Sequence, residues 1–204
     1  NLGWPADEVT RRHAGVLMPR PAGFGGLHEQ LSAQKADLIF ACFGLNESFA
    51  GEAGLKKFER DLDSILTELQ MGKFNGKRLP RIVLVSPIAT EQGSGNPNAN
   101  LAAYTSVMAK VATSRRIRFA DLFSPTRKWM VGNKVKTLTF NGIHLTEYGD
   151  RVVSRMMAEA LGLSGASTKA DPTGEKLRRV VYDKNHNFFI RWRGPNAEYI
   201  HGRR

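Results

Sequence analysis

The chain has 204 residues, of which 41% are hydrophobic, and its formal net charge is +11. This much apolar material supports one packed domain plus a short further segment, so a wholly disordered chain is excluded. No run of about 18 apolar residues occurs, which argues against a membrane-spanning helix, and the lone cysteine excludes an internal disulfide.

The positive charge is spread along the chain, with a denser group of arginines and lysines after residue 175. A basic balance raises nucleic acid as a partner, but scattered charges are more typical of a solvated surface, so nucleic acid is not the favoured partner. The histidines show no metal-ligand spacing with one another or with the cysteine, and we expect no metal and no cofactor. They are His13, His28, His144, His186 and His201.

The first half of the chain predicts a loop, a strand and a long helix. Residues 1–26 are rich in proline and glycine, which indicates a loop. Residues 37–43 are almost continuously apolar, and we expect a buried strand with Cys42 buried and inert within it. After a glycine-containing loop at 47–54, residues 55–71 carry an apolar stripe typical of an amphipathic helix. The stripe consists of Leu55, Phe58, Leu62, Ile65, Leu66 and Leu69.

The second half repeats the alternation of strand and helix. We expect strands at 81–87 and 117–123, helices at 99–114 and 147–163, and a long loop at 124–140. This order predicts an α/β fold with a parallel sheet and right-handed crossovers.

Two short segments combine a turn with side chains suited to catalysis. Gly44 and Asn46 follow the first strand, which places a side-chain amide at the carboxyl edge of the sheet, where α/β proteins build their sites. Asn141-Gly142-Ile143-His144 joins a tight-turn dipeptide to a histidine, and Thr146 is a suitable N-cap for the next helix. His144 therefore lies between a turn and a helix, where a scaffold can present a catalytic base. A lone histidine is nevertheless more often structural.

Two serines near the same sheet edge are poor candidates for a nucleophile. Ser86 ends the strand at 81–87, but Pro87 follows it directly, so the sharp turn that exposes a nucleophilic hydroxyl is absent. Ser94 lies in a flexible loop at 91–98 that fixes no position for its side chain.

Gly44-Leu45-Asn46-Glu47 and Asn141-Gly142-Ile143-His144 resemble two signature blocks of the SGNH (GDSL-type) hydrolases. The opening segment, residues 1–7, resembles a third block, and the resemblance covers residues 1–163. It implies a flavodoxin-like three-layer sandwich whose first strand is missing here. The family's nucleophilic serine lies in a Gly-Asp-Ser block upstream of these blocks, and no such tripeptide occurs in this chain.

The resemblance implies a role for each matching residue. His144 would be the general base, and Asn46 would donate to the oxyanion, together with the backbone N–H of Ala6, where the family has a glycine. Gly44 and Glu47 would support the site. The implied activity is hydrolysis of ester bonds, including O-acetyl groups on carbohydrate, with the serine outside this chain.

Asn141 departs from the family pattern, because it occupies the position of an aspartate that orients the histidine. Asparagine carries no charge, and in a serine protease the same replacement lowers the rate about ten-thousand-fold. Three outcomes stay open. A backbone carbonyl orients His144, another carboxylate such as Glu47 or Glu91 replaces the aspartate, or the site is slow or inactive and serves as a binding module.

The end of the chain differs in composition from the domain at 1–163. Residues 164–176 are typical of a linker, and residues 177–204 form a basic tail with interleaved aromatic residues. The tail could bind single-stranded nucleic acid by stacking, but we favour packing on the domain or the start of a further segment. It is similar to segments that follow SGNH domains in large bacterial proteins. The compartment is not indicated, although export is compatible with the resemblance.

Overall fold

The computed structural model describes residues 8–10, 26–91, 97–133, 135–163 and 172–192. Within them the elements are, in order, α1 (Leu27–Ala33), β1 (Leu38–Cys42), the 3₁₀ helix η1 (Glu47–Ala50), α2 (Gly51–Met71), β2 (Arg81–Val85), α3 (Pro97–Ser114), β3 (Arg118–Ala120), α4 (Phe123–Gly132), α5 (Glu147–Ala160) and α6 (Pro172–Trp192). The alternation of strands and helices confirms the predicted α/β class.

The sheet is parallel and has the order β1-β2-β3. Leu38 of β1 pairs with Arg81 of β2, and Val83 of β2 pairs with Arg118 of β3. All three carboxyl ends therefore lie at the same edge of the sheet, which is the edge where the sequence predicts the site.

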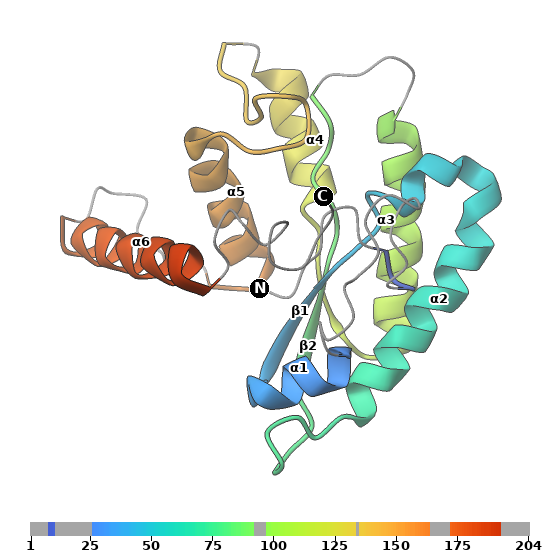
Figure 1. Cartoon of the computed structure of the whole chain (residues 1–204). Coiled ribbons are helices and arrows are strands. Elements are labelled where there is room, and N and C mark those ends of the chain that lie inside the picture. The colour runs from blue at the N-terminus through green and yellow to red at the C-terminus, as the bar shows by residue number, and fades with distance from the viewer. Residues whose placement is uncertain (1–7, 11–25, 92–96, 134, 164–171, 193–204) are drawn as a thin grey trace, which may run out of the picture.

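Helices cover both faces of the central strand, which explains why β2 is an uninterrupted apolar run. Ile82 and Leu84 belong to a core cluster with α2 and α3, whereas Val83 and Val85 belong to a second cluster with α5. Figure 1 shows α2 and α3 on one side of the sheet and α5 on the other. The three layers agree with the predicted sandwich.

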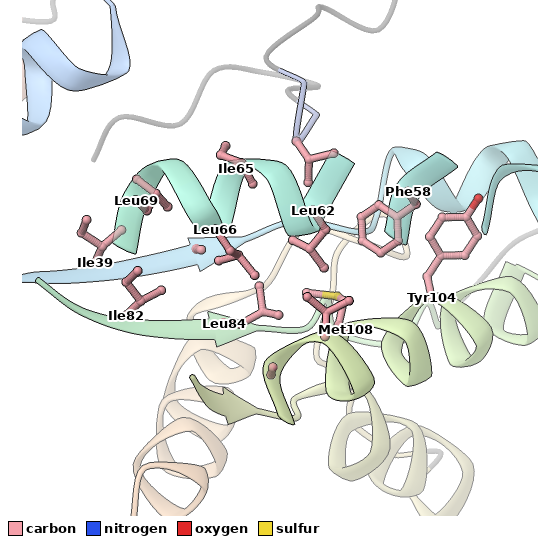
Figure 2. Packing of buried hydrophobic residues seen from close by; sticks show 14 of the residues in the cluster. Ile39, Phe58, Leu62, Ile65, Leu66, Leu69, Ile82, Leu84, Tyr104 and Met108 are labelled. Atoms are coloured by element: carbon pink, nitrogen blue, oxygen red, sulfur yellow. The ribbon is translucent and has the colours of Figure 1, made fainter. Parts of the chain in front are cut away.

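The apolar stripe of α2 fills the larger cluster. Phe58, Leu62, Ile65, Leu66 and Leu69 are all buried. Figure 2 shows them facing residues of β1, β2 and α3, with the Phe58 ring beside Tyr104.

The predicted loop at 47–54 is wrong, because η1 and the first turn of α2 occupy these residues. The two glycines that indicated a loop have different roles: Gly51 has a φ of 59° at the junction of η1 and α2, whereas Gly54 serves packing. A Cβ on Gly54 would lie 2.3 Å from the hydroxyl oxygen of Tyr104, so only glycine lets α2 approach α3 this closely. The Tyr104 hydroxyl also donates to the carbonyl of Gly51 at 3.0 Å.

β1 is not buried on both faces, which corrects the prediction for this strand and for Cys42. Ile39 and Ala41 are buried, whereas Leu38 and Phe40 are 40% and 45% exposed and Cys42 is exposed. Within the described chain β1 pairs only with β2, and the α5 layer lies over β2 instead. The face of β1 that carries Leu38 and Phe40 is therefore apolar and partly exposed in the described part of the chain.

The predicted loop at 124–140 is wrong over its first half, where α4 runs from Phe123 to Gly132. Pro125 lies in the first turn, where its missing N–H has no helical partner to lose. Phe123 and Thr126 are buried, and Trp129 packs against the second core cluster, which contains Val83, Val85 and Val153. These contacts, not a continuous apolar stripe, hold α4 in place.

α6 begins at Pro172, so residues 172–176 start a helix and do not belong to a linker. Its apolar side chains Leu177, Val180, Tyr182, Phe188 and Ile190 are exposed. The described residues of α6 therefore do not show the predicted packing of the tail on the domain. No helix in the described part of the chain is long and apolar enough to cross a membrane.

Candidate active site

A tight hairpin-like turn carries Asn141 and His144. Thr139 and Leu145 form an antiparallel bridge, and the backbone N–H of Phe140 donates to the carbonyl of His144 at 3.0 Å. Gly142 has a φ of 94°, which glycine adopts without strain. The turn therefore has a defined backbone, and it holds Asn141 and His144 at its exposed tip.

The turn is fixed to the start of α5. The Thr146 hydroxyl accepts from the backbone N–H of Gly149 at 3.0 Å, which confirms the predicted N-cap. The backbone N–H of Thr146 donates to the carbonyl of Leu138 at 2.8 Å. A Cβ on Gly149 would lie 1.9 Å from this same carbonyl oxygen, so glycine is required where α5 meets the turn.

Glu91 ties the turn to the segment that follows β2. Its carboxylate accepts from the backbone N–H groups of Leu138 and Thr139, both at 2.7 Å, and from the Thr139 hydroxyl at 2.5 Å. Its own backbone N–H donates to the carbonyl of Gly142 at 3.1 Å. Four contacts from one residue thus fix the His144 turn to the segment that follows β2.

The Asn141 side chain contacts both the backbone of its turn and the imidazole of His144. Oδ1 accepts from the backbone N–H of His144 at 2.9 Å and of Ile143 at 3.3 Å. Nδ2 and Oδ1 lie 2.9 and 3.1 Å from Nδ1 of His144. Asn141 therefore takes the place that the aspartate would have beside the ring, without its charge.

An aromatic side chain lies against the imidazole. The rings of Phe140 and His144 are stacked, with centroids 5.7 Å apart and planes at 22°. Phe140 is 70% exposed, and His144 is also exposed. Sequence reasoning missed this contact, because neighbouring positions in a turn give no periodic signal.

Gly44 and Asn46 lie beside the end of β2 as well. Gly44 has a φ of 104°, and a Cβ there would lie 3.4 Å from the ring of Pro87 and 3.1 Å from the sulfur of Met108. Glycine is thus the residue that this crowded turn accepts. Asn46 is the N-cap residue of η1, and its side chain is partly exposed.

Glu47 joins this turn to the segment near the N-terminus. Its carboxylate accepts from the backbone N–H of Gly44 at 2.9 Å and of Val9 at 2.8 Å. Ala6, the expected second oxyanion donor, lies outside the described residues, but this contact holds the chain three residues beyond it. The carboxylate of Glu47 accepts from these two amides, and that of Glu91 from Leu138 and Thr139, so these hydrogen bonds do not orient His144.

The pKa of Glu47 is raised above its ordinary value, because burial disfavours the carboxylate more than the N–H groups of Val9 and Gly44 favour it. The folded state then holds this proton more tightly than the unfolded chain. Its stability therefore falls as the pH rises above 4.5, the ordinary pKa of a glutamate side chain. We expect Glu47→Gln to remove this loss.

Urea unfolding of both proteins at several pH values between about 4 and 7 tests the expectation for Glu47. The free energy of unfolding of the wild type should decline relative to that of Glu47→Gln as the pH rises. A difference that stays constant, or that moves the other way, would show that the carboxyl group is not destabilised by burial.

Ser86 is buried and serves the fold. Its hydroxyl oxygen accepts from the backbone N–H groups of Leu122 and Phe123 at 2.8 and 3.0 Å. The hydroxyl also lies 3.1 Å from the carbonyl oxygen of Pro87. These contacts support the sequence-based rejection of Ser86 as a nucleophile. Ser94 lies outside the described residues.

No group of three or more histidine, cysteine, aspartate or glutamate side chains suited to a metal ion occurs in the described ranges.

No family model matches the chain, and no curated protein matches it by sequence. Solved structures do match. An acetylxylan esterase from Geobacillus stearothermophilus is 18% identical over 66% of this chain and 63% of its own, with a TM-score of 0.52. A second acetyl xylan esterase is 20% identical over 63% of this chain and 68% of its own, with a TM-score of 0.52.

A candidate GDSL-like lipase from Parabacteroides merdae is 18% identical over 65% of this chain and 63% of its own, with a TM-score of 0.53. The match thus spans less than two thirds of the Geobacillus and Parabacteroides proteins. Serine-to-alanine and aspartate-to-alanine variants of the Geobacillus enzyme are both catalytic mutants. The likeness shows that this protein has the SGNH/GDSL-type hydrolase fold.

Proposed function

We propose that this chain carries the ester-binding and proton-transferring part of an SGNH-type serine ester hydrolase, with the nucleophilic serine outside residues 1–204. The observation that carries the proposal is the fixed position of His144. Glu91 fixes its turn to the segment that follows β2, and Gly44 packs against Pro87 in the same segment. These contacts support a site in which His144 and the side-chain amide of Asn46 act at one edge of the sheet.

The fold gives independent support. The structures that match are esterases or a candidate lipase, and two of them act on acetylxylan, which is a carbohydrate carrying acetyl esters. We therefore propose a short-chain acyl ester as the substrate, with an O-acetyl group on carbohydrate as the favoured class.

The proposed reaction assigns one task to each group. A serine hydroxyl attacks the ester carbonyl, and Nε2 of His144 accepts the hydroxyl proton and later returns it to the leaving alcohol. The carbonyl oxygen gains negative charge and accepts a hydrogen bond from the side-chain amide of Asn46, with the backbone N–H of Ala6 as second donor. Asn141 contacts Nδ1 and sets the orientation of the ring.

Replacing Asn46 with alanine tests this assignment. Loss of one oxyanion donor should lower the rate of hydrolysis of a short-chain ester about a hundred- to a thousand-fold, while folding is kept. The assay uses the natural-length protein, meaning the chain together with the segment proposed to supply the serine. Asn185→Ala, on the exposed surface of α6, is the matched control and should keep the wild-type rate. An unchanged rate in Asn46→Ala would remove Asn46 from the mechanism.

The uncharged Asn141 favours a second candidate, a module that binds an acyl ester or its product without turnover. This candidate predicts that such a ligand raises the melting temperature of the protein while no hydrolysis is detected. Hydrolysis by the natural-length protein that depends on His144 would exclude it.

A further inference from the structure

Backbone amides fix the orientation of the Asn141 side chain. Its Oδ1 accepts from the N–H groups of His144 at 2.9 Å and of Ile143 at 3.3 Å. A backbone N–H can only donate, so the atom that faces both of these groups has to be the amide oxygen and not the NH2 group. Rotating the amide by half a turn would replace two hydrogen bonds with two contacts between donors.

This orientation directs the NH2 group of Asn141 at the imidazole. Nδ2 lies 2.9 Å from Nδ1 of His144, which is nearer than the 3.1 Å between Oδ1 and the same atom. An amide nitrogen has hydrogens and no lone pair to offer. A bare Nδ1 accepts from the NH2 group at 2.9 Å, which is the shorter contact. A hydrogen on Nδ1 would face that NH2 group, and its acceptor would be Oδ1 at 3.1 Å, which already accepts from two backbone N–H groups.

We infer that Asn141 holds His144 in the neutral tautomer whose hydrogen is on Nε2, and that this residue limits proton transfer at the site. In that tautomer Nε2 is a donor and cannot accept a proton from a hydroxyl group. An aspartate at position 141 would accept from the two backbone N–H groups and from a hydrogen on Nδ1 at the same time. The other tautomer, with Nε2 free to accept, would then be the stable one.

Among the described residues, the hydrogen-bond partners of Nδ1 are the two side-chain atoms of Asn141. Phe140 stacks on one face of His144 and provides no hydrogen-bond acceptor in the ring plane. The carboxylate of Glu91 is directed at Leu138 and Thr139. Asn141 is thus the side chain that decides which ring nitrogen carries the hydrogen.

The consequence for catalysis rests on the proposed function. Only the minor tautomer, with a hydrogen on Nδ1, can start the reaction, so the rate falls in proportion to its population. The imidazolium that forms next has hydrogens on both nitrogens and meets the same contact with Nδ2 of Asn141. In a serine protease the change from aspartate to asparagine lowers kcat about ten-thousand-fold through the wrong tautomer.

Nitrogen NMR of the full chain tests the tautomer directly and needs no turnover. Histidines labelled with ¹⁵N give distinct shifts for protonated and bare ring nitrogens, and the His144→Ala spectrum identifies the signals of His144. We expect the wild type to carry its hydrogen on Nε2 at a pH where His144 is neutral, and Asn141→Asp to carry it on Nδ1. A wild-type hydrogen on Nδ1 would overturn the inference.

The rate of ester hydrolysis provides a second test of the inference. In the natural-length protein, Asn141→Asp should raise kcat/KM about a thousand- to ten-thousand-fold, and the gain should vanish when His144→Ala is added. Asn185→Asp introduces the same charge on α6 and should leave the rate unchanged. Equal rates for the wild type and Asn141→Asp in a hydrolysing protein would contradict the inference. Absence of hydrolysis in every variant would instead contradict the proposed function, while the NMR spectrum still decides the tautomer.

Discussion

Gly149→Ala should destabilise the protein by about 3 kcal/mol or more, which places it among the severe single substitutions. The added Cβ would lie 1.9 Å from the carbonyl oxygen of Leu138 and 2.8 Å from its carbonyl carbon. Backbone atoms cannot rotate away as a flexible side chain can. The start of α5 would therefore have to move off the turn, which breaks the contacts of Thr146 with the same carbonyl.

Equilibrium unfolding in urea measures the effect of Gly149→Ala, with Gly132→Ala as the control. Gly132 ends α4, has no atom within 4 Å of an added Cβ, and should gain slightly in stability from the better helix propensity of alanine. A loss below about 1 kcal/mol for Gly149→Ala would show that α5 does not need glycine at its contact with Leu138.

Leu66→Ala should lower the free energy of unfolding by about 3 kcal/mol, within the range for a leucine truncated in a rigid core. Leu66 is fully buried between α2 and the sheet, and the neighbours shown in Figure 2 come from both layers. The surroundings are held by secondary structure on both sides, so they can close only part of the resulting cavity.

Leu79→Ala is the matched control for Leu66→Ala, because Leu79 is 52% exposed in the loop before β2. It should change the stability by roughly 0.5 kcal/mol or less. A similar loss for the two variants would mean that the cluster around α2 does not carry the stability of the domain.

The layers of the fold were predictable from the sequence because each main element has its own periodic signal. The unbroken apolar run of β2 and the stripe of α2 define the sheet and one covering layer. The boundaries near Gly51 and Gly54 were not predictable, since glycine indicates a loop in isolation. Gly54 is explained by the position of Tyr104, far along the chain, and Gly51 by a positive φ that no sequence pattern announces.

α4 and the exposed face of β1 were missed for a related reason. The apolar residues of α4 divide between two clusters, so they do not form one stripe. In β1 the sequence shows apolar residues on both faces, but what covers Leu38 and Phe40 depends on the neighbouring layer. Periodicity identifies a strand and does not say where in the sheet the strand lies.

The candidate site was predictable in part. Sequence blocks pointed to Asn46, Asn141 and His144, and the structure brings Asn141 and His144 into contact. The part played by Glu91 was not predictable, because its partners Leu138 and Thr139 are backbone amides, which carry no sequence signal. The direction of the Asn141 amide likewise follows from the turn and not from residue identity.

His144 is proposed to transfer a proton during ester hydrolysis. The most direct test is the initial rate of hydrolysis of a short-chain acyl ester by the natural-length protein, compared between the wild type and His144→Ala. His28→Ala is the control, because His28 lies on α1 and its ring contacts Glu68 and Phe74. We predict turnover by the wild type and by His28→Ala, and a rate that falls to background in His144→Ala. Turnover that is equal in all three proteins would contradict it.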